Sequence, residues 1–160
     1  VARTAMGRGR RHRPPRCQRP LHRAVARRRR SRQPPPARAA LTMDVLLVDD
    51  DATVRDTLEQ MLAAHGHRVR CAPDVGTALS MVDVTCPDVV LSDIRMPGAD
   101  GLDLLRNLRG SHPQLPVVLM TGFSESSTTA LAFELGVDGF LQKPVRVAEL
   151  LAGMERLRRE

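Results

Sequence analysis

Carboxylate side chains follow two short apolar runs in this sequence. Val45–Val48 leads directly into Asp49 and Asp50, and Val89–Ser92 is followed by Asp93. If both runs are neighbouring parallel strands, their carboxyl ends lie at the same edge of a sheet, where open α/β sheets bind ligands. Carboxylates gathered there repel one another, and they are tolerated mainly when a hard cation such as Mg²⁺ lies among them. The sequence therefore predicts a magnesium site.

A hydroxyl and an ammonium follow two further runs of the same kind. Thr121 is the last residue of Val117–Thr121, and Lys143 comes directly after Gly139–Gln142. Placed at the same edge, these two groups can neutralise the oxygens of a phosphoryl group carried by Asp93. Taken alone, a Thr or a Lys in such a place is usually a solvated surface residue. The four strand ends together favour phosphoryl chemistry on Asp93.

Other acidic residues at strand ends have a simpler interpretation. Asp51 and Asp74 stand where helices are expected to begin, and we interpret both as helix caps. Lys143 precedes Pro144, so the peptide bond between them is a candidate for the cis form.

The apolar runs alternate with amphipathic stretches from about Met43 onward, which is typical of repeated βα units around a parallel sheet. The expected strands are Val45–Val48, Arg68–Ala72, Val89–Ser92, Val117–Thr121 and Gly139–Gln142. The expected helices are Ala52–Ala64, Asp74–Val82, Gly101–Arg109, Ser124–Leu135 and Arg146–Arg158. The second strand alternates Arg with apolar residues, which indicates an edge strand.

The charge is divided unevenly between two parts of the chain. Residues 1–42 hold 14 Arg and no acidic residue, whereas residues 43–160 hold 11 basic and 18 acidic side chains, a formal charge of −7. The first part has almost no large apolar residues, so we expect a disordered Arg/Pro-rich extension at 1–42 and one folded domain at 43–160. The extension is either a basic arm that touches nucleic acid or an upstream segment without a selected role, and its composition favours the second.

Apolar runs such as Leu115–Met120 are far shorter than the roughly 18 residues that span a bilayer. No apolar export signal follows the Arg-rich segment. We therefore expect a cytoplasmic protein without membrane contact.

The folded part resembles the receiver domain of two-component response regulators, of the stand-alone, chemotaxis-regulator-like type. The motifs that carry the resemblance are Val48-Asp49-Asp50, Ser92-Asp93-Ile94-Arg95-Met96-Pro97-Gly98, Met120-Thr121-Gly122 and Gly139-Phe140-Leu141-Gln142-Lys143-Pro144. The resemblance implies a flavodoxin-like (βα)5 doubly wound parallel sheet with strand order 2-1-3-4-5. It also implies that Asp93 is the phosphoacceptor and that Thr121 and Lys143 bind the phosphoryl oxygens. The implied Mg²⁺ ligands are Asp49, Asp50, Asp93 and the backbone carbonyl of Arg95.

The resemblance further implies a signalling switch in which Thr121 and the aromatic residue Phe140 move together when Asp93 is phosphorylated. The surface formed by the fourth helix, the fifth strand and the fifth helix then changes toward a downstream protein. Phe140 stands where a Tyr is common, so its coupling is expected to be steric. The implied phosphodonor is a sensor histidine kinase or a histidine phosphotransfer protein.

The implied activity is that of a phosphoacceptor rather than an enzyme, with at most slow self-phosphorylation and self-dephosphorylation. Bulky side chains at Arg95 and Phe123 lead us to expect slow phosphate loss. Two alternatives remain: a receiver used only for docking without phosphorylation, and a nucleic-acid-associated regulator acting through the Arg-rich arm.

Overall fold

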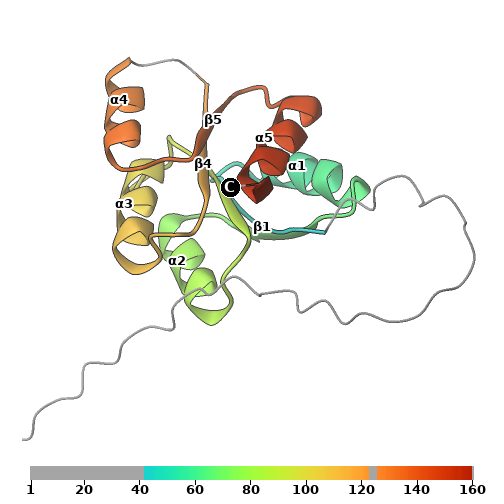
Figure 1. Ribbon diagram of the computed structural model, residues 1–160, viewed down its shortest axis with the longest axis horizontal. Helices are drawn as coiled ribbons and strands as arrows, with labels where there is room; N and C mark the ends of the chain where they lie inside the picture. The colour runs from blue at the N-terminus through green and yellow to red at the C-terminus, as the bar shows by residue number, and fades with distance from the viewer. Residues whose placement is uncertain (1–41, 123–125, 160) are drawn as a thin grey trace, which may run out of the picture.

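A computed structural model describes residues 42–122 and 126–159 of the chain, in which five strands alternate with five helices (Figure 1). The strands are β1 (Asp44–Val48), β2 (Arg68–Ala72), β3 (Val89–Asp93), β4 (Val117–Thr121) and β5 (Gly139–Gln142). The helices are α1 (Ala52–Ala64), α2 (Val75–Val84), α3 (Gly101–Ser111), α4 (Ser126–Glu134) and α5 (Val147–Arg159). The predicted alternation of strands and helices is confirmed.

The bounds of α1 are as predicted, whereas α2, α3 and α5 differ from the prediction by one or two residues at one or both ends. Asp74 was expected as the first residue of a helix, but it lies just outside α2 and its carboxylate accepts the backbone N–H of Thr77 at 2.7 Å. The interpretation of Asp74 as a cap is therefore confirmed. Likewise, α5 begins one residue later than predicted and includes Arg159.

All strand pairs in the sheet are parallel, and the order is β2-β1-β3-β4-β5. This order confirms the predicted flavodoxin-like topology. It also places β2 at an edge, as its alternating Arg residues indicated. Because β1 and β3 are neighbours and Val48 pairs with Ser92, the residues that follow them come out at the same end of the sheet.

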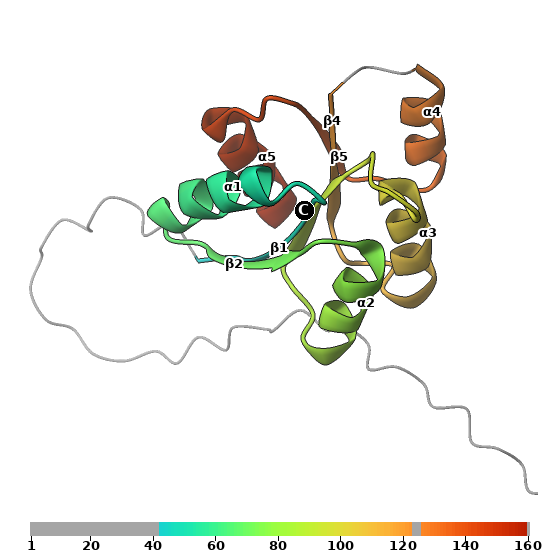
Figure 2. The same ribbon diagram turned by 180° about the vertical axis from the view of Figure 1, so that it is seen from behind.

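The helices cover both faces of the sheet, with α1 and α5 on one face and α2, α3 and α4 on the other (Figures 1 and 2). Successive residues of β1 point to opposite faces, so Leu46 packs toward α2 and α3 while Leu47 packs toward α1 and α5. Both side chains are fully buried. Burial on two sides explains why the central strands are continuous apolar runs.

The prediction for residues 1–42 falls outside the described residues except for Thr42, which is exposed. Among the described helices, none combines the length and apolar character needed to cross a bilayer.

Candidate functional site

Three carboxylates meet at the carboxyl ends of β1 and β3. Oxygens of Asp49, Asp50 and Asp93 all lie within 4.8 Å of one another. Asp49 is fully buried and Asp93 nearly so, whereas Asp50 is exposed. The predicted convergence of these side chains is thus present.

Lys143, which follows β5, brings a positive charge into this cluster. Its Nζ donates to Oδ2 of Asp49 at 2.7 Å and lies 3.1 Å from Oδ2 of Asp93. The backbone N–H of Lys143 donates to the carbonyl of Thr121 at 2.8 Å, which fixes the end of β5 against the end of β4. The Lys143–Pro144 peptide bond is cis, as predicted.

The pKa values of Asp93 and Lys143 both differ from their ordinary values. Burial raises the pKa of Asp93 above its ordinary value, and the charge of Asp49 adds to that shift. Hydrogen bonds from Lys143 and from the backbone of Arg95 act in the opposite direction. Burial tends to lower the pKa of Lys143, but its hydrogen bonds to Asp49 and Asp93 outweigh burial and raise that pKa.

Asp51 serves the helix rather than the cluster. Its carboxylate accepts the backbone N–H groups of Thr53 at 2.8 Å and Val54 at 3.4 Å, which confirms the predicted cap of α1. Its own backbone N–H donates to Oδ1 of Asp49 at 2.9 Å, so the start of α1 also orients that carboxylate.

The loop after Asp93 is closed by the start of α3. Asp100 and Asp103 form a reciprocal capping box. The backbone N–H of Gly101 donates to the carbonyl of Ile94 at 2.9 Å, and a Cβ at Gly101 would overlap the backbone carbonyl of Asp93. The sequence places Gly101 at a helix start, but the close approach to Asp93 is visible only in three dimensions.

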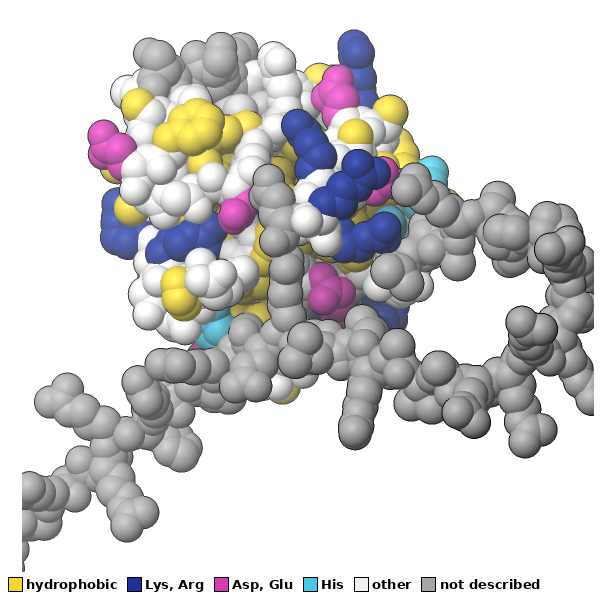
Figure 3. All heavy atoms as spheres, in the orientation of Figure 1, with side chains coloured by type: hydrophobic (Ala, Val, Ile, Leu, Met, Phe, Trp, Pro, Cys, Tyr) yellow, Lys and Arg dark blue, Asp and Glu magenta, His cyan; other side chains and the backbone are white. Residues whose placement is uncertain are grey.

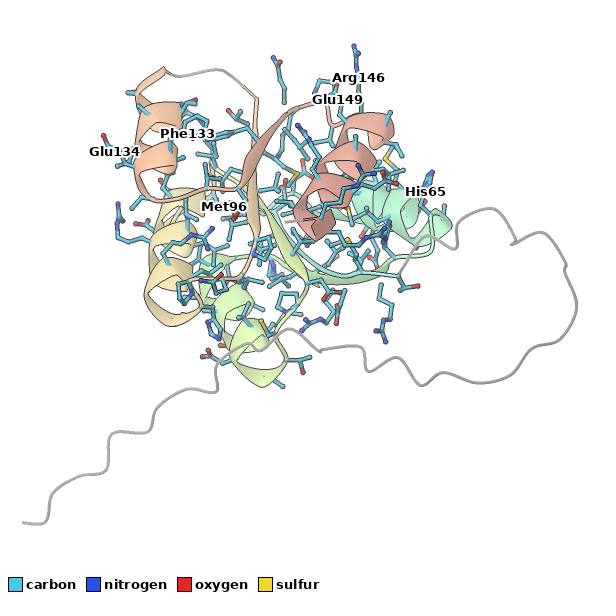
Figure 4. All side chains as sticks on the ribbon, in the orientation of Figure 1. His65, Met96, Phe133, Glu134, Arg146 and Glu149 are labelled. Atoms are coloured by element: carbon cyan, nitrogen blue, oxygen red, sulfur yellow. The ribbon has the colours of Figure 1, made fainter. Side chains whose placement is uncertain are left out.

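A cavity of about 570 Å³ lies beside the carboxylates, and its lining includes Asp50, Arg95, Met96, Thr121 and Thr128. In Figure 4, Met96 lies in the region between the sheet and the helices α3 and α4. Thr128 was not identified from the sequence, because nothing in the local pattern of α4 distinguishes it from its neighbours. The hypothesis on Phe123 concerns a residue outside the described ranges.

Phe140 on β5 is half-buried and contacts a second aromatic side chain. The centroids of the Phe140 and Phe133 rings lie 5.3 Å apart with the planes at 60°. Phe133 is on α4, is 63% exposed and projects from the helix in Figure 4. The weak amphipathicity of α4 gave no signal for this contact in the sequence.

The donor set suits a hard divalent cation. Mg²⁺ prefers oxygen ligands, especially carboxylates, and the three aspartates offer such oxygens around one point. The Asp93 carboxylate also accepts the backbone N–H of Arg95, which places that residue next to the cluster.

Comparison with known proteins gives the family. Residues 45–155 match the response regulator receiver domain. The chain belongs to the response regulator receiver domain family. The receiver domain is 40% identical over 112 residues to the DNA-binding transcriptional regulator NtrC of Salmonella typhimurium, covering 70% of this chain and 24% of that protein. It is 37% identical over 119 residues to the response regulator MprA of Mycobacterium tuberculosis, covering 74% of this chain and 52% of that protein.

Solved structures of receiver domains have the same fold as this chain. A receiver domain protein from Clostridium thermocellum matches with a TM-score of 0.69 and 28% sequence identity. The match covers 71% of this chain and 92% of the Clostridium chain. A response regulator from Chloroflexus aurantiacus matches with a TM-score of 0.69 and 32% sequence identity. The match covers 74% of this chain and 99% of the Chloroflexus chain.

The chain spans between about a quarter and a half of the length of the curated relatives named above. Its receiver domain places it in two-component phosphorelay signalling. Receiver domains interact with histidine kinases or phosphotransfer proteins and typically bind Mg²⁺ at an acidic pocket.

Proposed function

We propose that Asp93 accepts a phosphoryl group from a phosphohistidine of a sensor histidine kinase or a histidine phosphotransfer protein. The observation that carries the proposal is the ammonium of Lys143, which lies between the carboxylates of Asp49 and Asp93 at the ends of three different strands. An ammonium in that place is already positioned to contact a phosphoryl group attached to Asp93.

In the proposed transfer, a carboxylate oxygen of Asp93 attacks phosphorus and forms a new P–O bond. The P–N bond to the donor imidazole breaks, and its electron pair stays on the imidazole nitrogen. Lys143 then donates to an oxygen of the transferred group, and Thr121, which lines the adjacent cavity, offers its hydroxyl to another.

The proposed metal ligands are Asp49, Asp50, Asp93 and the backbone carbonyl of Arg95. When bound, Mg²⁺ supplies positive charge that offsets the negative charge of the phosphoryl oxygens. Asp49 is held in place for this role by the N–H of Asp51 and by Lys143.

We propose that the site serves as a phosphoacceptor and not as the active site of an enzyme. Self-phosphorylation from small donors and hydrolysis of the acyl phosphate are proposed to be slow. The exposed Arg95 side chain at the cavity is proposed to limit the approach of water. The proposed location is the cytoplasm, where phosphohistidine donors of this class act.

The proposed output is a change of the surface made by α4, β5 and α5, which recruits a downstream protein. Figure 3 shows hydrophobic side chains over α4 and several Lys and Arg side chains over α5. Phe133 and Leu131 are exposed on α4, and Arg156, Arg158 and Arg159 are exposed on α5. The ring contact between Phe140 and Phe133 supports a steric link between β5 and this surface.

The proposal is tested by intact mass spectrometry of the 160-residue chain after incubation with acetyl phosphate, with and without Mg²⁺. The expected result is a Mg²⁺-dependent gain of one phosphoryl group that is removed by hydroxylamine. Asp93→Asn removes the acceptor and should abolish the gain. Asp83→Asn, an exposed carboxylate on α2, serves as the matched control and should react like the parent chain.

Absence of any gain, in conditions where a known receiver reacts, would refute the proposal and favour a receiver that acts only by docking. A gain that persists in Asp93→Asn would place the phosphoryl group elsewhere.

A further inference from the structure

Asp49 is held by hydrogen bonds at each of its polar atoms. Its backbone N–H donates to the carbonyl of Ala72 at 3.2 Å, and its two carboxylate oxygens accept from the backbone N–H of Asp51 and from Lys143. The remaining atom, its backbone carbonyl, accepts from Nη1 of Arg55 at 2.6 Å. Arg55 has no part in the site described above.

The position of Arg55 explains why it reaches this carbonyl. It is the fourth residue of α1, and helical side chains lean toward the N-terminus of their helix, here toward the end of β1. The β1–β2 register ends at the pair Val48 and Ala72, so the carbonyl of Asp49 lies just beyond the regular ladder. The guanidinium supplies the donor that the ladder does not, in a short, charge-assisted hydrogen bond.

We propose that Arg55 is a positioning residue for the metal carboxylates, an inference that rests on the proposed function. The carbonyl that it binds belongs to the peptide unit joining Asp49 to Asp50. Fixing that peptide unit fixes the direction in which both side chains leave the backbone, and the ligands of a small cation must be held closely in place.

Arg55 also carries a positive charge to the backbone of Asp49, and this charge acts on cation binding in the opposite direction to the positioning effect. By Coulomb's law, removing the guanidinium strengthens the attraction of the site for a cation. Loss of positioning weakens cation binding instead. The two effects differ in sign, so the direction of the change on substitution decides between them.

The decisive experiment is calorimetric titration of MgCl₂ into the 160-residue chain, which has no Trp or Tyr to report binding by intrinsic fluorescence. Arg55→Met keeps the length of the side chain and removes the donor. We expect its dissociation constant for Mg²⁺ to rise about tenfold, the lower end of the range for groups that orient metal ligands. Arg68→Met removes the same charge from an exposed position at the opposite end of β2 and should change the constant by less than about twofold.

A second readout separates positioning from a general loss of structure. Phosphorylation by acetyl phosphate is followed by intact mass over a Mg²⁺ series. In Arg55→Met the half-saturating Mg²⁺ concentration should rise by the same factor of about ten, and the extent at saturating Mg²⁺ should return to the parent level. A variant that is merely misfolded would react less at every Mg²⁺ concentration.

Unchanged or tighter Mg²⁺ binding in folded Arg55→Met would overturn the inference and leave the proposed function intact. If circular dichroism shows that this variant does not fold, Arg55→Lys decides, because it keeps the charge but loses the guanidinium geometry. An affinity loss of about threefold in that variant supports positioning, and an unchanged affinity overturns it. A parent chain that binds no Mg²⁺ would refute the metal part of the proposed function together with the inference.

Discussion

The two ends of the parallel sheet carry the same kinds of side chain with different partners. At the amino end, Asp44, Asp88 and Asp138 stand at the beginnings of β1, β3 and β5. Asp44 lies 3.2 Å from Arg70, and Asp138 lies 2.6 Å from Arg109. Asp88 accepts the backbone N–H of Asp44 at 2.7 Å. Each of these carboxylates therefore has a partner within the fold.

At the carboxyl end, Asp49 and Asp93 both contact the ammonium of Lys143, and an oxygen of Asp50 lies within 4.8 Å of oxygens of both. Two of the three carboxylates touch that single ammonium, so negative charge remains in excess at this end. The comparison indicates that aspartates at strand ends point to chemistry when they converge on one place and share one ammonium, and not when each has its own partner. We therefore expect the amino end to contribute stability and the carboxyl end to hold the proposed cation and phosphoryl site.

The largest predicted effect follows from removing one charge at the carboxyl end. Asp50→Asn should weaken Mg²⁺ binding by about 100- to 1000-fold, because a unit charge about 4 Å from a cation near a protein surface is worth about 4 kcal/mol. Since Asp50 is exposed and shares its surroundings with two like charges, the free energy of unfolding without Mg²⁺ should stay the same or rise slightly. Calorimetric titration and urea unfolding measure the two quantities.

Asp83→Asn removes an exposed carboxylate from α2 and is the control for Asp50→Asn. Its Mg²⁺ affinity should match that of the parent chain. A loss of stability in Asp50→Asn as large as its loss of cation affinity would contradict the contrast between the two ends.

The next effect comes from the packing of α3 against the end of β3. Gly101→Ala should lower the free energy of unfolding by about 3 kcal/mol, since the added Cβ overlaps backbone atoms of Asp93 and Ile94 that cannot move aside. Gly110→Ala in the same helix has open space around the new Cβ and should instead stabilise the protein by about 0.5 kcal/mol. Chemical denaturation of both variants checks the pair, and equal effects would mean that the close approach at Gly101 is relieved by movement of α3.

Much of this architecture could be predicted from the sequence, because parallel strands covered on both faces leave apolar runs and turn residues at regular spacing. The strand ends also revealed Asp49, Asp93, Thr121 and Lys143, since one topological rule brings such ends together. The sequence did not reveal contacts that a long side chain makes with a different element of the fold. Arg55 finds its carbonyl only because β2 stops at Ala72, and no periodicity encodes that event.

Interactions at the amino end of the sheet were also not predicted, because they too join side chains from different elements. Nothing in the spacing of Arg109 and Asp138 indicates that they meet, because the contact joins α3 to the turn before β5. Phe133 was similarly missed, since its partner Phe140 comes from another element.

A third prediction concerns a carboxylate at the amino end. Asp138→Ala should lower the free energy of unfolding by about 2 kcal/mol, because it removes the partner of Arg109 and of the backbone N–H of Val117, which Asp138 accepts at 2.8 Å. Mg²⁺ affinity should stay within about twofold of the parent value, since the site lies at the other end of the sheet. Urea unfolding and calorimetry provide the measurements.

The control for Asp138→Ala is Asp83→Ala, which should change stability by less than about 0.5 kcal/mol as an exposed surface substitution. If both alanine variants were equally stable, the amino end could not be assigned a stabilising role.

The smallest predicted effect is a pH dependence at the amino end, where His67 precedes β2. Burial, together with the charges of His65 and Arg158, holds the pKa of His67 below its ordinary value of 6.5, while Glu155 lines the same hollow. Nδ1 of His67 accepts the backbone N–H of Met43 at 3.3 Å, which requires that nitrogen to be unprotonated. The unfolded chain therefore takes up a proton more readily than the folded one, and stability contributed by His67 is lost as the pH falls below about 6.5.

Between pH 7.5 and 5.5 the parent chain should lose about 2 °C more in Tm than His67→Gln, whose amide oxygen can still accept from the backbone N–H of Met43. Equal losses in the two proteins would show that His67 titrates alike in the folded and unfolded states and would contradict the prediction.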